Sequence, residues 1–335
     1  MPFFTSITRI SDLRRSGNFA VEAIPREHWA RGDYVMGTVT GDPSPLYLIE
    51  STTGRMVPVM EGDHVIGAFG DREATLEGVG SWQAIEGRSM HALTAAGLLG
   101  LLTSKADMVP GLMELEYVGH ITRDSTKLGM GDFVRPAEAR QLDIPVIALV
   151  GTSMSAGKTT TGRVIIHELK KMGMKVAGVK LTGAARYRDI LRFKDAGADA
   201  IFDFVDMGLP STVIPEDEYR PLLDMVLSRV MDAGVDVLVA EAGASPLEPY
   251  NGAACIEALS GHMVLRVLCA SDPYAVVGVQ RAYGFAPDVV AGPAAATRAA
   301  IRLVKKLTGV PAVNVLHRDA FPEIAAMLKT SLGIS

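Results

Sequence analysis

The feature that most constrains the fold is a glycine-containing loop between an apolar run and a helical pattern. Residues 146–150 are apolar without interruption and lead directly into Gly-Thr-Ser-Met-Ser-Ala-Gly-Lys-Thr at residues 151–159. Residues 159–172 then show the apolar spacing of an amphipathic helix. A buried strand that passes through a short loop into a helix is the repeating unit of a parallel sheet, because parallel strands need a long crossover. The chain therefore contains an α/β domain.

This alternation of strand and helix continues to the C-terminus. The predicted strands are 146–150, 176–179, 235–240, 264–268, 288–291 and 312–316, and the predicted helices are 159–172, 188–196, 220–233 and 294–307. Near-continuous apolar strands that alternate with helices indicate a mainly parallel sheet with helices on both faces. We assign residues 141–335 to this three-layer domain.

Residues 1–140 have a different pattern, with short β-rich runs separated by turn residues. The predicted strands are 34–40, 46–50, 55–59, 64–69, 74–77 and 113–122, with turns at 41–43, 53–54, 61–63 and 70–71. Residues 132–134 are expected to close the sheet, residues 90–103 to form a buried helix, and residues 135–141 to form a linker. We predict a β-rich, barrel-like or sandwich-like N-terminal domain. Its hairpin at 61–72 is either scaffold, an oligomer contact or a source of substrate specificity.

The composition excludes several classes of function. The chain has 335 residues, enough for two domains, and a net charge of −5, which favours neither nucleic acid nor an anionic membrane as a partner. The sequence contains no run of about 18 apolar residues, which is the length needed to span a bilayer. Cys255 and Cys269 lie in apolar surroundings and are expected to be buried thiols of a reducing cytoplasm. No Cys/His cluster has the spacing of a zinc site.

The loop at 151–159 resembles a phosphate-binding loop of the Walker A type. Backbone N–H groups of such a loop, and the positive end of the following helix, surround a polyphosphate. Gly157 has no β-carbon and allows a phosphate to approach the backbone closely. Lys158 supplies positive charge for the oxygens of the β- and γ-phosphates, and the Thr159 hydroxyl can ligate Mg²⁺. The residues expected to contact the nucleotide are Gly151, Thr152, Ser153, Met154, Ser155, Ala156, Gly157, Lys158, Thr159 and Thr160.

The loop departs from the usual form in one place, since Thr152 stands where a glycine is usual and Gly151 lies one residue earlier. In this shifted form it resembles dethiobiotin synthetase and its relatives in the nitrogenase-iron-protein-like class of P-loop enzymes. Four downstream segments are also similar to that family: residues 176–183, 188–191, 209–211 and 237–244. The resemblance implies an active-site lysine at Lys180, a metal-binding aspartate at Asp189 and a Mg²⁺-binding glutamate at Glu241.

A second resemblance covers residues 241–252, which contain Glu-Ala-Gly-Ala-Ser and then Pro, Tyr and Gly. This segment is similar to the two-domain P-loop family that includes D-glutamate N-acetyltransferase. Residues 1–140 show no match to the N-terminal domain of that family. The resemblance implies acyl transfer from an acyl-CoA whose phosphates occupy the loop.

Position in the predicted sheet gives several residues two interpretations. Glu241 and Lys180 end apolar strands at the carboxyl edge, where open α/β sheets bind ligands, but each could simply terminate a strand. Asp189 is a metal ligand or one member of a charged surface. The remaining candidates are Thr182, Gly183, Arg186 and Arg188 for an anionic substrate, Glu248, Tyr250 and Asn251 for substrate contact, and Asp272, Pro273, Tyr274 and Asn314 for a nucleotide base. His262 and His317 are isolated, which favours structural roles.

We expect a cytoplasmic, ATP- and Mg²⁺-dependent enzyme of the ligase or kinase type that transfers a phosphoryl group to a small carboxylate-type substrate. Lys158, Lys180 and Glu241 would be catalytic, and Thr159, Asp189 and Glu241 would hold the metal. The expected partners are an anionic small molecule and further copies of the chain in a dimer or higher homo-oligomer. Two alternatives stay open: an acyl-CoA-dependent N-acyltransferase, and a non-catalytic nucleotide-dependent switch.

Overall fold

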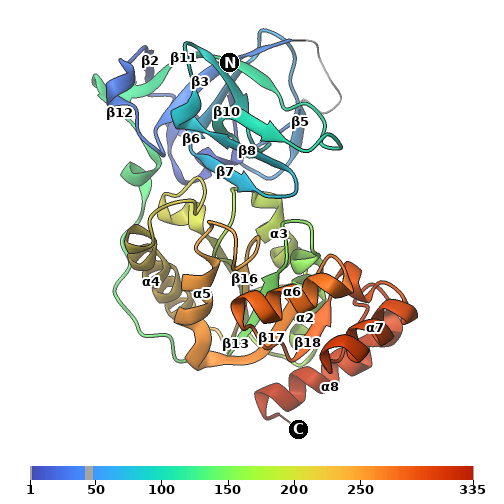
Figure 1. Ribbon diagram of the computed structural model, residues 1–335. Coiled ribbons are helices and arrows are strands. Elements are labelled where there is room, and N and C mark those ends of the chain that lie inside the picture. The colour runs from blue at the N-terminus through green and yellow to red at the C-terminus, as the bar shows by residue number, and fades with distance from the viewer. Residues whose placement is uncertain (1, 42–47, 335) are drawn as a thin grey trace. The chain divides into compact units, whose positions relative to one another are not determined.

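The structure, a computed structural model, describes residues 2–41 and 48–334. The chain forms two compact units, shown in Figure 1. The β-rich unit comprises Met1–Pro136, Ala184–Arg188 and Phe204–Val213, and the parallel-sheet unit comprises Ala137–Gly183, Asp189–Asp203 and Ile214–Ser335. Two short segments of the C-terminal half therefore cluster with the N-terminal residues. The predicted domains, 1–140 and 141–335, are continuous ranges and do not include such an exchange of segments.

The parallel-sheet unit is an α/β fold, as predicted from the sequence. Its strands are β13 (Val146–Gly151), β14 (Val176–Lys180), β15 (Ala200–Asp203), β16 (Val237–Ala242), β17 (Met263–Cys269) and β18 (Val289–Ala291). They are all parallel, in the order β15-β14-β16-β13-β17-β18. Every residue of β13, β14 and β16 is buried, which explains why these strands are continuous apolar runs.

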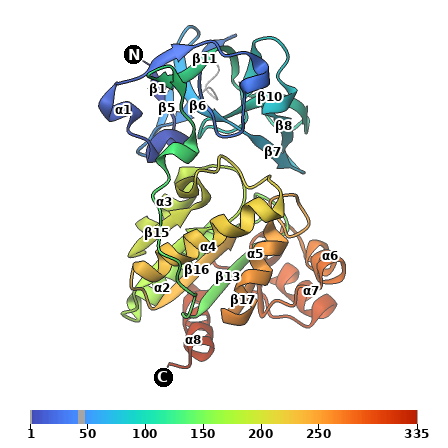
Figure 2. The same ribbon diagram turned by 90° about the vertical axis from the view of Figure 1, so that its left-hand side faces the viewer.

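Helices cover this sheet. They are α2 (Lys158–Lys171), α3 (Tyr187–Asp195), α4 (Glu216–Asp232), α5 (Gly252–Leu259), α6 (Pro273–Tyr283), α7 (Arg298–Thr308) and α8 (Phe321–Leu332). Helix α2 packs on β13, β14 and β16, and α4 and α5 pack against each other, as Figure 2 shows. Gly162 of α2 lets α3 approach, because a β-carbon there would lie 2.6 Å from the Phe193 ring. Among the described residues, no helix is long and apolar enough to cross a membrane.

One prediction for the parallel-sheet unit is wrong, and another has a different starting residue. Residues 312–316 are not a strand, since only Ala312 forms a bridge, to Val290, and the Asn314 side chain turns the chain by accepting from Leu316 N. The helix expected at 294–307 is present as α7, but it begins only at Arg298 and is preceded by the 3-10 helix η7 (Pro293–Ala295). The break lies at Thr297, whose hydroxyl caps α7 by accepting from Ala300 N. Strand β15 and helices α5, α6 and α8 are not among the elements predicted from the sequence.

The β-rich unit contains a mixed sheet of ten strands. They are β1 (Phe3–Phe4), β2 (Ala20–Glu22), β3 (Tyr34–Thr40), β6 (His64–Phe69), β7 (Asp71–Ala74), β8 (Gly78–Ser81), β9 (Ser89–Ala92), β10 (Leu98–Lys105), β11 (Glu114–Arg123) and β12 (Thr126–Lys127). Strand β6 pairs with both β3 and β10, so that the pairings β6-β3-β11-β9-β10 form a cycle. A separate pair consists of β4 (Leu48–Glu50) and β5 (Met56–Pro58). The core includes Phe69, Met90 and Leu115.

The helix predicted at 90–103 is wrong, because this segment forms β9 and most of β10. Its Ala, Leu and Gly content suggested a helix, but tertiary pairing overrides such a preference. Gly97 turns the chain with φ +91°. Gly100 permits a close strand crossing, since a β-carbon there would lie 2.8 Å from the backbone of Ser81 and Trp82. Glycine at these positions serves strand packing rather than helix packing.

Smaller differences occur elsewhere in this unit. The strand expected at 74–77 is wrong, because β7 already ends at Ala74 and the chain turns before β8. The strand expected at 132–134 is wrong as well, since η4 (Met130–Phe133) is a 3-10 helix in which the Asp132 carboxylate accepts from Gly129 N. Part of the predicted turn at 41–43 (residues 42–43) and part of the predicted strand at 46–50 (residues 46–47) lie outside the described residues.

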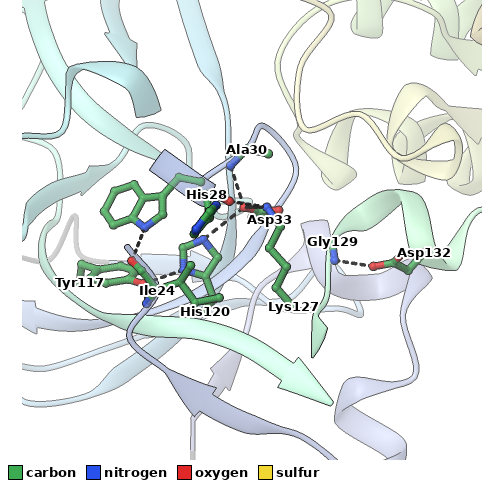
Figure 3. Close-up of polar contacts among 10 residues, drawn as sticks. Ile24, His28, Ala30, Asp33, Tyr117, His120, Lys127, Gly129 and Asp132 are labelled. Carbon is green, nitrogen blue, oxygen red and sulfur yellow. Dashed lines mark hydrogen bonds and ion pairs between the residues drawn. The ribbon is translucent and has the colours of Figure 1, made fainter. Parts of the chain in front are cut away.

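A buried polar network fastens the segment before β3 to strand β11 (Figure 3). Tyr117 Oη lies 2.6 Å from His120 Nδ1, and His120 Nε2 lies 3.2 Å from Asp33 Oδ2. The same Asp33 oxygen accepts from Lys127 Nζ at 2.8 Å and from Ala30 N at 2.7 Å. A neutral His120 that donates to Asp33 and accepts from Tyr117 satisfies every one of these contacts. The network is therefore a closed structural unit in which each charge has a partner.

A second buried carboxylate explains why residues 184–188 belong to the β-rich unit. Glu50 is completely buried, and its oxygens accept from Ser6 Oγ at 2.5 Å, Tyr187 N at 2.7 Å and Arg188 N at 2.8 Å. The two backbone groups belong to the first turn of α3, where N–H groups lack partners within the helix. Glu50 thus satisfies those two N–H groups and links this segment to the β-rich unit.

Candidate functional site

The glycine loop connects β13 to α2 at the carboxyl edge of the parallel sheet. Gly157 is the N-cap of α2 and has φ +93°, a left-handed conformation that favours glycine. Gly151 must also be a glycine, because a β-carbon there would lie 2.6 Å from Ala244 O and would collide with Lys158 Nζ. The loop therefore brings its backbone and Lys158 into a space that any larger residue would fill.

Neighbouring strand ends support the loop from one side. Thr152 N donates to Cys269 O at 3.0 Å, and Thr152 Oγ1 accepts from Ser271 N at 3.1 Å. Gly292, which follows β18, has φ +82°, and a β-carbon there would collide with Ala156 O. The segments after β17 and β18 thus hold the loop against the sheet edge.

Lys158 is buried, with a relative exposure of 3%. Its ammonium donates to Ser153 O at 2.7 Å and to Ala244 O at 3.2 Å. Burial lowers the pKa of Lys158, and the nearby carboxylate of Glu241 only partly opposes this effect. Ala244 has φ +39°, an uncommon backbone conformation for a residue with a side chain, directly at the carbonyl that Lys158 contacts. A phosphate oxygen would be a stronger partner for Lys158 than either carbonyl.

Glu241 and Thr159 come together, as predicted for metal ligands. The Thr159 hydroxyl donates to Glu241 Oε2 at 3.0 Å. Burial raises the pKa of Glu241, while Lys158 and Lys180 act in the opposite direction. A hydroxyl and a carboxylate side by side are hard oxygen ligands that fit Mg²⁺, which keeps several of its waters. No group of three or more His, Cys, Asp or Glu side chains that could hold a metal occurs among the described residues.

Asp189 lies at the same site but is bonded to Lys180. Lys180 Nζ donates to Asp189 Oδ2 at 2.8 Å, and both side chains are largely buried. Burial lowers the pKa of Lys180, but Asp189, Glu241 and Asp203 outweigh it, so the net shift is upward. Asp189 thus contacts the lysine directly and lies close enough to Glu241 to contribute to the raised pKa of that carboxyl group.

Sequence reasoning missed one carboxylate at this edge, Asp203, which ends β15 and is 1% exposed. It is aligned with Lys180 of the neighbouring strand. A signal was present, because Asp203 follows the apolar residues Ala-Ile-Phe in the same way that Lys180 ends β14.

The expected anionic-substrate pocket is not assembled within one unit. Thr182 and Gly183 belong to the parallel-sheet unit, whereas Arg186 and Arg188 belong to the β-rich unit. The Thr182 hydroxyl donates to Gly243 O at 2.8 Å. Arg186 is exposed, and Arg188 Nε lies 3.4 Å from Glu50 Oε1. Thr182 and Arg188 thus have structural partners, and Arg186 lies at the surface.

The segment after β16 stays close to the loop. Glu248 is near enough to Lys158 to raise the pKa of that lysine slightly. Tyr250 is completely buried, and Asn251 has φ +62°, caps α5 and donates from its amide to Ile214 O at 2.9 Å. Of the three residues predicted to contact substrate, Glu248 is the one whose charge acts on Lys158.

The residues considered for a nucleotide base have mixed positions. The Asp272 carboxylate caps α6 by accepting from Tyr274 N and Ala275 N, and Pro273 is the first residue of that helix. Tyr274 is 69% exposed beside the segment that supports the loop. The Asn314 amide donates to Ala296 O at 2.9 Å. His262 ends η6 (Ser260–His262), whereas His317 is exposed before η8 (Arg318–Ala320).

Both cysteines are buried, as predicted from their apolar surroundings. Burial raises the pKa of Cys255 to about 12 and that of Cys269 to about 11. Cys269 Sγ lies 3.5 Å from Thr161 Oγ1 on α2. Neither thiol has the depressed pKa of a reactive cysteine.

Comparisons with known proteins assign no family. No family model matches the chain, and no curated protein is similar to it. Three similar solved structures each give a TM-score of 0.37: chloroplast FtsY from Physcomitrella patens (16% identity, 52% of this chain, 59% of that one), a DUF1611 family protein from Anabaena variabilis (19%, 60% and 60%) and the signal recognition particle receptor FtsY from Elizabethkingia anophelis (16%, 61% and 75%). The chain spans about three fifths of the first two. At these TM-scores the likeness assigns neither family nor function.

Proposed function

We propose that the protein is a P-loop enzyme that binds ATP with Mg²⁺ and transfers the γ-phosphoryl group to a small carboxylate-type substrate. The observation that carries the proposal is Lys158, a buried ammonium at the start of a helix whose hydrogen bonds within the described part of the chain go to two carbonyl oxygens. Such a charge is costly to bury without an anion, and the adjacent amides at the helix N-terminus favour an anion as well.

The residues present fit a nucleotide and its metal. Glycines at 151 and 157 leave room for close approach of a polyphosphate to the backbone. Thr159 and Glu241 would hold Mg²⁺, with Asp189 close to Glu241 and bonded to Lys180. The bound cation would supply charge neutralisation on the phosphate oxygens.

The protein groups would act by position and charge. An oxygen of the acceptor forms the new bond to the γ-phosphorus, the bond from that phosphorus to the β–γ bridging oxygen breaks, and ADP leaves. Lys158 and Lys180 would stabilise charge on the transferred group, as phosphoryl transfer needs little covalent help from the protein. We place this chemistry in the dethiobiotin-synthetase-like class on the sequence motifs discussed above.

We infer two functional domains near 1–140 and 141–335, a barrel-like form for the first, a homo-oligomeric state and a cytoplasmic location. The cycle of strand pairings in the β-rich unit supports the barrel-like description.

The test is calorimetric titration of Lys158→Met and wild type with ATP and MgCl₂. We expect the affinity of Lys158→Met for ATP to be at least about 100-fold lower than that of wild type, because one charge-assisted contact to phosphate is removed from a buried site. Arg163→Met, an exposed residue of the same helix, is the matched control and should bind as wild type does. Equal ATP affinity in Lys158→Met and wild type would refute the proposal. Titration with acetyl-CoA in parallel would favour the acyltransferase alternative if CoA alone bound.

A further inference from the structure

We propose that Thr152 is a positioning residue whose hydroxyl completes the pairing of β13 with the segment after β17 and thereby fixes the start of the glycine loop. The use of this loop by a nucleotide rests on the proposed function, whereas the pairing itself does not. In this assignment Thr152 acts on the shape of the loop and does not touch the phosphate.

The register of the sheet shows which bond the hydroxyl replaces. Gly151, which ends β13, is aligned with Cys269 of β17, so the next residue, Thr152, stands opposite the one that follows β17. In a parallel ladder, a residue in this position donates its N–H to the residue before its partner and accepts at its carbonyl from the residue after it. Thr152 N does donate to Cys269 O at 3.0 Å. Ser271 N instead donates to the Thr152 hydroxyl at 3.1 Å, so the side chain takes the acceptor position of a carbonyl.

The segment that holds this hydroxyl is itself fixed. Ala270 N donates to Ala291 O at 3.1 Å, and Ala270 O accepts from Ala294 N at 2.9 Å. Ser271 Oγ donates to Asp272 Oδ2 at 3.0 Å, and the other oxygen of that carboxylate caps helix α6. The segment after β17 is therefore tied to the end of β18 and to α6, and it provides a firm partner for the loop.

A side-chain acceptor lets the chain leave the sheet at Thr152 without losing this pairing. A strand that continued past Gly151 would use its carbonyl and run on beside β17, whereas a hydroxyl acceptor leaves the backbone free to turn. The next residue, Ser153, is buried, and its carbonyl accepts from Lys158 Nζ at 2.7 Å. Thr152 thus sets the starting point of the turn that holds Lys158.

This function explains why the loop departs from the usual form at position 152. Glycine, the usual residue there, has no side-chain acceptor and permits many backbone conformations. Threonine supplies the acceptor and restricts the backbone, so the nucleotide-free loop is already close to its bound shape and loses less entropy on binding. Restoring the usual glycine should therefore weaken phosphate binding rather than strengthen it.

The direct test is hydrogen exchange of the Ser271 amide, followed by NMR in nucleotide-free protein. We expect exchange to be about tenfold faster in Thr152→Val than in wild type, because a side chain of nearly the same shape without an acceptor is introduced. Thr152→Ser keeps the hydroxyl and should exchange within about threefold of wild type. Unchanged protection in Thr152→Val, or lost protection in Thr152→Ser, would overturn the proposal.

Thr297→Val is the matched control, because the Thr297 hydroxyl also accepts from a backbone amide at 3.1 Å, that of Ala300 in α7. This variant loses an equivalent bond within the same unit. It should speed the exchange of the Ala300 amide and leave that of Ser271 unchanged. An equal effect of Thr297→Val on Ser271 would show that the loss of any such bond loosens the unit, and the role assigned to Thr152 would fail.

Binding measurements separate a positioning role from a purely structural bond. Calorimetric titration with inorganic triphosphate and with ATP, each with MgCl₂, should give about tenfold lower affinity in Thr152→Gly and Thr152→Val, and affinity close to wild type in Thr152→Ser. The loss should be equal for the two ligands, because the loop would hold only the phosphates that they share. Wild-type affinity in Thr152→Gly would contradict the positioning role, as would a loss confined to ATP.

The two proposals fail in different ways. If wild type binds neither ligand, the proposed function is refuted, and exchange of the amides at 153–157 in nucleotide-free protein then decides whether Thr152 positions the loop. Faster exchange of these amides in Thr152→Val than in Thr297→Val would support the proposal. Equal exchange in the two variants would contradict it.

Discussion

The two units each bury a cluster of ionisable side chains, but the clusters are organised in opposite ways. In the β-rich unit, Asp33 accepts three hydrogen bonds on one oxygen, and His120 links it to a tyrosine hydroxyl. In the parallel-sheet unit, Glu241 at the end of β16 acts on the pKa of Lys158 at the start of α2 and of Lys180 at the end of β14, and both lysines act on the pKa of Glu241. The first cluster satisfies itself, whereas the second leaves a buried ammonium on carbonyl oxygens.

The contrast separates a structural network from a candidate site. A satisfied network gains from each contact and loses much when one is removed. A cluster in which burial works against the charged forms is poorly compensated until a ligand arrives, as is common at functional sites. Removing one carboxylate from each cluster should therefore have different results.

The largest effect is expected from Asp33→Ala. It leaves the buried His120 and the partly exposed Lys127 without their shared partner, which should lower the free energy of unfolding by about 2 to 3 kcal/mol. Both tryptophans, Trp29 and Trp82, lie in the β-rich unit, so urea unfolding followed by fluorescence reports on that unit.

Asp12→Ala provides the control for this prediction, because its pair with Arg123 is partly exposed and worth less than about 1 kcal/mol. ATP affinity should be the same in both variants. An Asp33→Ala protein as stable as Asp12→Ala would remove the distinction between the two clusters.

The next effect concerns Glu241→Gln, which should change stability little but weaken Mg²⁺-dependent ATP binding about tenfold or more. Burial already favours the neutral acid, so a neutral isostere is tolerated, whereas a metal ligand is lost. Calorimetry with and without MgCl₂ measures the binding. Identical metal dependence in variant and wild type would exclude Glu241 as a ligand.

A pH dependence of stability accompanies that substitution. Because the pKa of Glu241 is raised on folding, the folded protein binds more protons than the unfolded chain above the ordinary value of 4.5. The stability of wild type relative to Glu241→Gln should therefore fall as pH rises from 4.5. Urea unfolding at several pH values provides the test, and a difference that grows with pH would contradict the assigned direction.

Lys158 should give the opposite slope at alkaline pH. Its pKa is lowered on folding, so the unfolded chain holds more protons in the range that ends at the ordinary value of 10.5. Wild type should gain stability relative to Lys158→Met as pH rises toward 10.5. Thermal unfolding at pH 8, 9 and 10 measures this difference; a flat profile would show that the ammonium is adequately compensated without ligand.

The smallest effect is expected for labelling of the two cysteines, which reports on unfolding of the parallel-sheet unit alone. Both thiols are buried and have raised pKa values, so a thiol reagent at pH 8 should react negligibly with the native protein and fully after unfolding. A Cys255→Ser variant assigns the two signals. Rapid labelling of the native protein would show that this unit opens more readily than its packing suggests.

Local sequence patterns predicted the central elements of the candidate site. The strand at 146–150, the glycine loop and the following helix are consecutive in sequence, and the structure contains them as β13, the loop and α2. Lys180 and Glu241 were recognisable because each ends an apolar run, and parallel strands bring such ends to one edge. These inferences needed only the chain on either side of each residue.

Other features depended on contacts between distant residues. The segment at 90–103 has a helix-like composition, yet pairing with β6, β8 and β11 makes it strands. Glu50 captures the first turn of α3 from more than one hundred residues away, a contact that no local pattern predicts. Asp203 became visible as a neighbour of Lys180 only when the register was known.

By itself, the sequence determined the elements whose character arises from periodicity and loop chemistry, namely the parallel α/β sheet and its glycine loop. Tertiary structure alone decided which strand ends are neighbours, which charges share a buried space and which unit each connecting segment joins. The physical reason is that hydrophobic periodicity is a local property, whereas burial, pairing register and the pKa of an ionisable group depend on residues that the fold brings together.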